Sequence, residues 1–297
     1  MNLSAAFVDF WAMEGIALLM FMGLAFLEGL IFRIPAKLKP PAELLTDLFY
    51  WTTAPILRQL ETIVVASVLA VATMWAGWTV PGGLANGFGP LAKLPFPVAV
   101  VIALIVVDLA SYWLHRVLHA VPFLWRFHAI HHSSPKLRWS SAGRTHPLNE
   151  LVNYMAGVLP CLAVGLPVQT VVTLLPIMTT WSVVVHSDFR WTFGKLGGWI
   201  VSPIGHHWHH THSSEGGNKN FANILSLWDR MFGSFYLPSD RLPERFGLDN
   251  DPMPENYLKQ LIYPFQSPEV VAVPTQKPEA TARPSWQITS ARDTQAQ

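Results

Sequence analysis

Long runs of apolar residues recur along the chain and predict membrane-spanning helices. A span needs about 20 mainly apolar residues to cross about 30 Å of hydrocarbon. Residues 62–81 meet that length without a charge, and residues 94–114 meet it with one acidic residue, Asp108. Residues 10–32 are apolar apart from two glutamates near the ends. No basic residue precedes this stretch and no small-residue cleavage site follows it, so we expect a retained span rather than a signal peptide.

A fourth apolar region, residues 151–185, carries no charge over 35 positions. As one straight helix it would measure about 52 Å, which is longer than a bilayer is thick. The region contains four helix-breaking residues: Pro160, Gly165, Pro167 and Pro176. The segment VGLP at 164–167 is typical of a turn. The pattern therefore predicts a helical hairpin that enters the membrane and returns.

The overall composition agrees with an all-α integral membrane protein with about four membrane-embedded helical regions. The chain is 51% hydrophobic and only 13% charged, against about 25% charged residues in an ordinary soluble domain. The alternative, a soluble protein with buried core helices, fits poorly with so little charge. The formal net charge of +1 gives no basic field for nucleic-acid binding. The single cysteine, Cys161, excludes disulfides within the chain, thiolate zinc sites and iron–sulfur clusters.

Basic residues predict the orientation of the spans. They are frequent after the first and third apolar regions, whereas only Lys93 lies in the loop between the second and the third. The positive-inside rule therefore places the N-terminus outside and everything after His115 on the cytoplasmic side. From about residue 265 the chain is rich in Pro, Thr, Ala and Gln, which predicts a disordered tail.

All 12 histidines lie between His115 and His212. HRVLH has its histidines at i and i+4, while HAIHH and HHWHH each repeat the spacing i, i+3 and i+4. Residues three and four apart lie on one side of a helix, so several helices can together enclose two metal ions in a cytoplasmic helical cap. The candidate ligands in these motifs are His115, His119, His128, His131, His132, His206, His209 and His210, and His186 stands alone at the end of the hairpin.

The ligand type restricts the metal and the chemistry. Neutral imidazoles suit iron, zinc, copper or nickel rather than calcium or magnesium. HRVLH lacks the glutamate that a zinc protease of the HExxH type needs, and nine histidines are too many for a structural zinc site with four ligands. Two redox-active ions with open positions for O2 fit better. Zinc remains a substitute, because it binds such sites more tightly than iron(II) does.

The runs DLASYWLHRVLHAVPFLWRFHAIHHSS (108–134) and HHWHHTH…NKNFANILSLWDRMFGSFY (206–236) resemble the fatty acid hydroxylase/sterol desaturase superfamily, which is characterised by HxxxH, HxxHH and HxxHH boxes. The resemblance covers about residues 96–237. It divides the chain into N-terminal transmembrane helices (1–93), a catalytic domain (94–240) and a C-terminal extension (241–297).

The resemblance implies a di-iron enzyme that uses O2 to hydroxylate or desaturate a C–H bond of a lipid, such as a fatty acyl chain or sterol. The histidines of the three boxes and His186 match the family's metal ligands, and no further catalytic residue is expected. His146, Asp108 and Asp188 are candidates for an additional ligand or for a group that orients one. His207 and His212 are extra to the boxes, and we expect solvent or hydrogen-bond roles for them.

Several alternatives stay open. The same boxes serve desaturases and monooxygenases that cleave ether or C–C bonds, and a membrane metal transporter or metal-binding protein is a reading of a different class. The sequence contains no nicotinamide or flavin motif, so we expect a separate electron donor: a reductase, a ferredoxin or a cytochrome. The compact length favours a bacterial inner membrane, or the endoplasmic reticulum membrane if the source is eukaryotic. The substrate is not specified by the sequence.

Overall fold

A computed structural model of the chain describes residues 41–75, 86–212, 215–249 and 253–266. The predicted first span at 10–32 lies outside the described residues, as does the tail predicted from about residue 265, apart from its first two residues. The described residues form helices and loops without a β-strand, which confirms the predicted all-α fold. In chain order the helices are α2 (Pro41–Trp75), α3 (Phe96–Ala120), α4 (Pro122–His132), α5 (Pro147–Ala163), α6 (Val168–His186), α7 (Pro203–His209), α8 (Leu227–Met231) and α9 (Tyr257–Ile262), with short 3-10 helices η2 (Leu91–Lys93), η3 (Trp139–Gly143), η4 (Gly194–Gly198) and η5 (Tyr263–Phe265).

Among the described residues, three helices are long and apolar enough to cross a membrane: Ala42–Trp75, Phe96–Ala120 and Val168–His186. The helix that contains the second predicted span, 62–81, begins earlier, at Pro41, and residues 76–81 of that span lie outside the described residues. The first half of α2 carries acidic residues, so it does not form an uncharged apolar run in the sequence. Glu43 and Asp47 are buried against the protein, where they are paired rather than exposed to lipid.

The predicted hairpin is present as α5 and α6, joined by the turn at 164–167. Gly165 adopts a φ of 84°, and a Cβ there would lie 2.3 Å from the carbonyl oxygen of Phe88. Pro160 and Pro176 were expected to break the helices, but each lies inside one. A proline removes one helical hydrogen bond, which packed neighbours tolerate. With 17 residues, α5 is shorter than a typical span, so a fourth membrane region stays a prediction.

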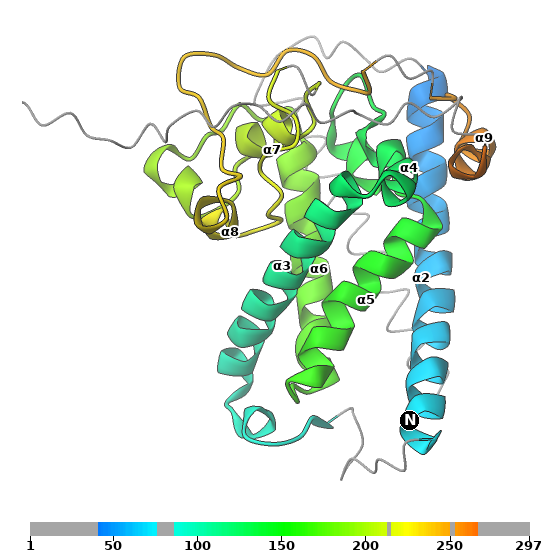
Figure 1. Cartoon of the computed structure of the whole chain (residues 1–297), viewed down its shortest axis with the longest axis vertical. Coiled ribbons are helices and arrows are strands. Elements are labelled where there is room, and N and C mark those ends of the chain that lie inside the picture. The colour runs from blue at the N-terminus through cyan, green and yellow to red at the C-terminus, as the bar shows by residue number, and fades with distance from the viewer. Residues whose placement is uncertain (1–40, 76–85, 213–214, 250–252, 267–297) are drawn as a thin grey trace, which may run out of the picture.

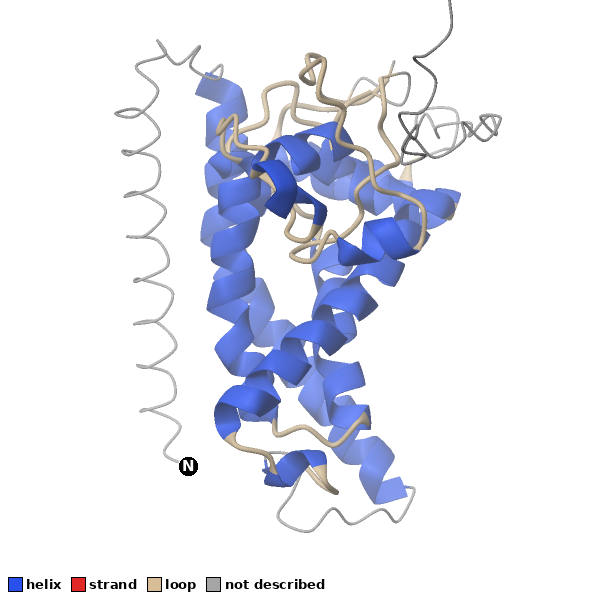
Figure 2. Ribbon diagram, turned by 90° about the vertical axis from the view of Figure 1, so that its left-hand side faces the viewer, coloured by secondary structure: helices blue, strands red, loops and turns tan. Residues whose placement is uncertain are grey.

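The helices form an upright bundle with a cap at one end (Figure 1). In the bundle, α3 packs against both α5 and α6, and small side chains such as Ala99 and Ala103 are buried at this contact. The outward side of α2 exposes large apolar residues, including Val68 and Val71, as expected for a surface that faces lipid. Short helices α4, α7 and α8 and the loops around them gather at the opposite end from the α5–α6 turn (Figure 2). The cap brings all three histidine motifs together.

Candidate metal centre

Nine histidines converge in the cap as two adjacent groups. In each group, one candidate ligand atom per residue lies within 4.8 Å of all the others. The five-histidine group consists of His115, His119, His128, His132 and His209, and the four-histidine group consists of His131, His186, His206 and His210. The groups touch, because the rings of His132 and His210 stack with their centroids 4.3 Å apart. The structure thus brings together all nine histidines that the sequence singled out.

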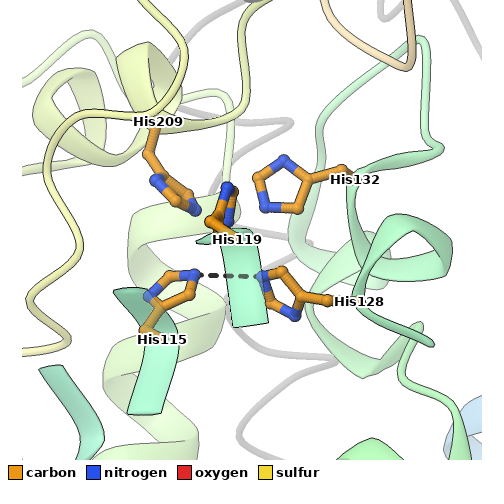
Figure 3. A group of neighbouring side chains, drawn as sticks. All are labelled: His115, His119, His128, His132 and His209. Atoms are coloured by element: carbon orange, nitrogen blue, oxygen red, sulfur yellow. Dashed lines mark hydrogen bonds between the residues drawn. The ribbon is translucent and has the colours of Figure 1, made fainter. Parts of the chain in front are cut away.

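The five-histidine group is assembled from three helices (Figure 3). His115 and His119 come from α3, His128 and His132 from α4, and His209 from α7. The Nε2 atoms of His115 and His128 lie 3.0 Å apart. The Nε2 atoms of His119, His132 and His209 are buried without a hydrogen-bond partner among the described residues.

The four-histidine group is held together by short contacts between Nε2 atoms. His186, at the end of α6, contacts His131 of α4 at 3.2 Å and His206 of α7 at 3.2 Å. His206 in turn lies 3.1 Å from His210, the residue that caps α7. Four imidazoles from three helices therefore point at one small volume.

Hydrogen bonds to Nδ1 fix the tautomer of six of these rings. A carbonyl oxygen can only accept, so a ring nitrogen beside one carries the proton and leaves Nε2 free as a lone-pair donor. His115 donates from Nδ1 to the Phe221 carbonyl at 2.8 Å, and His209 donates to the Lys219 carbonyl at 2.8 Å. The other four pairs are His119 with Asn218 Oδ1 (2.9 Å), His128 with Asn149 Oδ1 (3.2 Å), His131 with the Arg144 carbonyl (3.2 Å) and His186 with the Ser182 carbonyl (2.7 Å).

Three of these acceptors belong to one short segment, residues 218–221, which we call the acceptor loop. Sequence reasoning did not assign a role to it. The loop is fixed by Asp229, whose carboxylate accepts from the backbone N–H groups of Phe221 (2.7 Å) and Ala222 (3.0 Å). Asn220, in the left-handed region with a φ of 55°, ties it to the backbone of Tyr236. Asparagine tolerates this conformation better than most residues, so the run NKNF was a usable signal.

A buried ion pair supports the four-histidine group. Arg144, whose carbonyl accepts from His131, donates to Asp47 of α2 from Nε at 2.8 Å and from Nη2 at 2.5 Å. Ser140 also donates to Asp47, at 2.7 Å. Arg144 and Asp47 are both almost fully buried. The first helical turns of α2 thereby fix the loop that follows α4.

Burial keeps the cap imidazoles neutral, which is the form that binds metal. Loss of solvation lowers the pKa of His131 to about 4. Loss of solvation, reinforced by neighbouring imidazoles, also holds the pKa values of five others well below the usual range: His128, His132, His206, His209 and His210. Proton competition for these nitrogens is therefore weak near neutral pH.

The donor set fits metal ions of the kind that imidazole prefers. An ion about 2.1 Å from each nitrogen holds its ligand atoms no more than about 4.2 Å apart, so groups spread over at most 4.8 Å need only a small contraction. Buried nitrogens without a partner are costly unless something binds them. An ion in the five-histidine group would take up the three unpartnered Nε2 atoms.

The remaining candidates lie outside both groups. His146 caps α5: Nδ1 accepts from the Leu148 backbone N–H at 3.1 Å, and Nε2 donates to the Leu261 carbonyl at 3.2 Å. Both ring nitrogens are used, so this structure does not support His146 as a ligand. Asp188 belongs to neither group.

Asp108 does not contact a ligand ring either. Its carboxylate accepts from the backbone N–H groups of Ile224 and Leu225, both at 2.9 Å, and from the Trp228 indole at 3.0 Å. It thus anchors the chain immediately after the acceptor loop, so its effect on the histidines is indirect.

The two extra histidines also have other partners. His207 donates from Nε2 to the Ser187 carbonyl at 3.0 Å, and burial lowers its pKa to about 4. His212 lies 2.7 Å from Asp249 on a partly exposed surface. Neither belongs to a metal-binding group.

A cavity of about 270 Å³ leads from the histidines into the bundle between α2, α3, α5 and α6. His115 and His128 of one group and His131, His186 and His206 of the other line its end. Apolar side chains of α6, among them Leu174, Leu175 and Met178, line the opposite part. The cavity is thus lined both by rings of the two histidine groups and by apolar side chains.

Comparison with known proteins identifies a matching family model and several relatives. Residues 100–234 match the family model for fatty acid hydroxylase. Ornithine lipid hydroxylase OlsE of Rhizobium tropici is 29% identical over 171 residues, which cover 58% of this chain and 51% of the relative. Alkylglycerol monooxygenase of Danio rerio is 30% identical over 141 residues (48% and 31%), and that of Homo sapiens is 28% identical over 136 residues (46% and 30%). No solved structure matches.

The matched region contains all nine clustered histidines: the eight of the three motifs, in order, and His186 between the second and third motifs. Residues 100–234 thus form a fatty acid hydroxylase domain, as the histidine motifs indicated, and the chain is similar to a lipid hydroxylase and to alkylglycerol monooxygenases. It spans about half the length of the first of these relatives and about a third of the others.

Proposed function

We propose that this protein is a membrane-bound oxidoreductase that uses O2 to hydroxylate a C–H bond of a lipid, with two iron ions held by the five- and four-histidine groups. The observation that carries the proposal is the convergence of nine imidazoles on two adjacent points at the end of a cavity. The relatives support it, because their names describe a lipid hydroxylase and monooxygenases that act on alkylglycerols. Desaturation and ether or C–C cleavage are the alternative outcomes at the same site.

The proposed reaction breaks a C–H bond and forms a C–O bond. One oxygen atom of O2 enters the product and the other leaves as water, with two electrons and two protons from an external donor. Iron, when bound, supplies the activation of O2. The protein's own residues supply the neutral Nε2 donors, the fixed tautomers and a dry end of the cavity, since seven of the nine histidines are buried.

The proposal also includes a docking side for the electron donor and an expected membrane. We expect a reductase, ferredoxin or cytochrome to dock on the side of the molecule that carries the cap, since both histidine groups lie there. The expected location is a bacterial inner membrane with the histidines on the cytoplasmic side, or the endoplasmic reticulum membrane in a eukaryote. Three helices that are long and apolar enough to span support a membrane location.

The test combines metal analysis with product analysis. The protein is purified in detergent, loaded with iron and supplied with lipid extract, a chemical reductant and O2. Mass spectrometry distinguishes the outcomes, because hydroxylation adds an oxygen atom whereas desaturation removes two hydrogens. Label from isotopically enriched O2 should appear in a hydroxylated product. Turnover without O2 would contradict the proposal, and metal flux into proteoliposomes without any lipid oxidation would favour a transporter.

A further inference from the structure

One wall of the cavity carries charged and polar side chains, which a purely hydrocarbon substrate does not require. Arg58 in the middle of α2 donates from Nη2 to Glu150 of α5 at 3.2 Å, and both side chains line the cavity. Asn153 and Tyr154 of α5 continue this lining, and Tyr154 accepts from Thr62 at 3.2 Å. Ionisable groups at this depth of a membrane helix are costly, and they commonly serve function.

The charges around this wall do not balance. Glu61, one helical turn after Arg58, does not itself line the cavity, but it is 7% exposed, and neither of its carboxyl oxygens has a hydrogen-bond partner among the described residues. It is close enough to Glu150 and Arg58 to interact electrostatically with both. Two carboxyl groups thus share one guanidinium, which is already paired with Glu150. The unmet requirement is for a hydrogen-bond donor or a positive charge.

The wall lies directly beside the histidines. Asn149, which accepts from His128, immediately precedes Glu150 on α5, and Asn153 follows one turn further along. Four residues of helix rise by about 6 Å. A polar group bound at Glu150 would therefore sit within about one or two helical turns of the five-histidine group. The apolar wall of α6 offers a place for the attached hydrocarbon chain.

We propose that the charged wall, formed by Arg58 and Glu150 with Glu61 beside them, binds the headgroup of an amphipathic substrate that carries an amine, and holds this end next to the histidines. This inference rests on the proposed function, because it names the substrate class of the proposed oxidation site. An amine donates hydrogen bonds to both carboxyl groups and supplies the missing positive charge. A carboxylate headgroup would add a third anion and compete with Glu150 for Arg58. Oxidation would then fall on carbons near the polar end.

Binding is measured without turnover, on metal-loaded protein in detergent, with neither O2 nor reductant. The probes are a saturated amine, alcohol and carboxylate of one chain length, titrated by calorimetry. We expect the amine to bind at least about tenfold more tightly than the carboxylate, as charge-assisted hydrogen bonds allow. The alcohol should lie between them. Equal or tighter binding of the carboxylate would overturn the proposal.

Variants separate recognition from structural support. Glu61→Gln and Glu150→Gln should each reduce the preference for the amine about tenfold, while Glu244→Gln, at an exposed glutamate, should keep it. If Glu150→Gln fails to fold because its contact with Arg58 joins α2 to α5, Glu61→Gln still decides, because its carboxyl group has no such bond. An unchanged preference in Glu61→Gln would show that the wall does not bind the amine.

The position of the headgroup is tested with cobalt(II)-loaded protein, in which a paramagnetic ion speeds the relaxation of nearby ligand protons. Protons beside the amine should relax faster than those of the terminal methyl group, and the reverse order would contradict the inference. These readouts are independent of oxidation. Amine binding without lipid oxidation would reject the proposed function and leave the subsite, whereas oxidation without an amine preference would reject the subsite alone.

Discussion

The five-histidine and four-histidine groups differ in how they are held and in what they face. In the larger group, three Nδ1 atoms donate to the acceptor loop and only His115 and His128 line the cavity. In the smaller group, His131 and His186 donate to carbonyls of their own surroundings, and three of the four rings line the cavity. The five-histidine group is hydrogen-bonded to the acceptor loop, whereas the four-histidine group has the larger share of its rings lining the cavity.

This difference indicates distinct roles for the two ions. Five imidazoles leave few positions free on an ion, whereas four leave more for O2 or substrate. We expect the five-histidine group to bind its ion more tightly and the four-histidine group to be the more accessible one. The following predictions test that asymmetry.

The largest effect is expected from removing a ligand of the smaller group. His131→Ala leaves three imidazoles there, so we expect the protein to bind one ion fewer, with more than about 100-fold weaker affinity at that site, and to lose oxidation. Elemental analysis counts the ions, and His212→Ala, which lies in neither group, is the matched control. Unchanged metal content in His131→Ala would contradict the ligand assignment.

Removing Asp47 should weaken the fold on the side of the four-histidine group. Asp47→Ala leaves Arg144 buried without its main partner, which typically costs about 3–5 kcal/mol. We expect a lower temperature of unfolding and loss of metal from the smaller group first. The exposed pair of Arg245 and Glu215 provides the control, because Glu215→Ala should change stability by less than about 1 kcal/mol.

Acid should destabilise the metal-free protein between about pH 6.5 and pH 4. The folded state keeps His131 and His207 neutral down to a pKa of about 4, whereas the unfolded chain takes up protons near pH 6.5. The unfolded state therefore binds more protons in this window, and stability falls as the pH falls. Each such histidine contributes about 3 kcal/mol of loss. Denaturant titrations across this range measure it.

His207→Gln is the variant that isolates one of these contributions. It should flatten the pH dependence while both metal sites stay intact, because His207 belongs to neither group. A stability that does not change between pH 6.5 and pH 4 would show that the cap imidazoles titrate normally. Metal release should likewise begin only below the free histidine value of about 6.5, for the same reason.

A smaller effect is expected from the acceptor loop. Asn218→Ala removes the acceptor of His119 Nδ1, and loss of such a partner typically costs 10- to 100-fold in metal affinity. We expect the five-histidine group to lose its ion at lower chelator concentration, with the four-histidine group unchanged. Asn256→Ala, at an exposed asparagine that neither belongs to the loop nor lines the cavity, is the control. Equal weakening of both groups would contradict their separate support.

Sequence spacing predicted the site better than the boundaries of the membrane helices. Histidines gave a clear signal because their clustering has few structural explanations, and all nine candidates converge. The sequence predicted a span only over residues 62–81, whereas α2 begins at Pro41 and carries the buried acids Glu43 and Asp47 in its first two turns. Pro160 and Pro176 looked like breakers, yet packed helices accommodate them. In each case, packing contacts with residues distant in the sequence had more influence on the structure than the local sequence pattern.

The sequence by itself determined the helical fold, the family and which imidazoles gather, because i, i+3 and i+4 spacing places rings on one side of a helix. Only the tertiary structure decided how they divide. The i and i+4 members of each motif stay together, while His131 and His209, the i+3 members, join the other group. Successive residues turn by about 100° around a helix, so i+3 and i+4 point about 100° apart. Two ions between crossing helices can be bound by rings that point in both of these directions. The sequence of a single helix does not specify which ring joins which group.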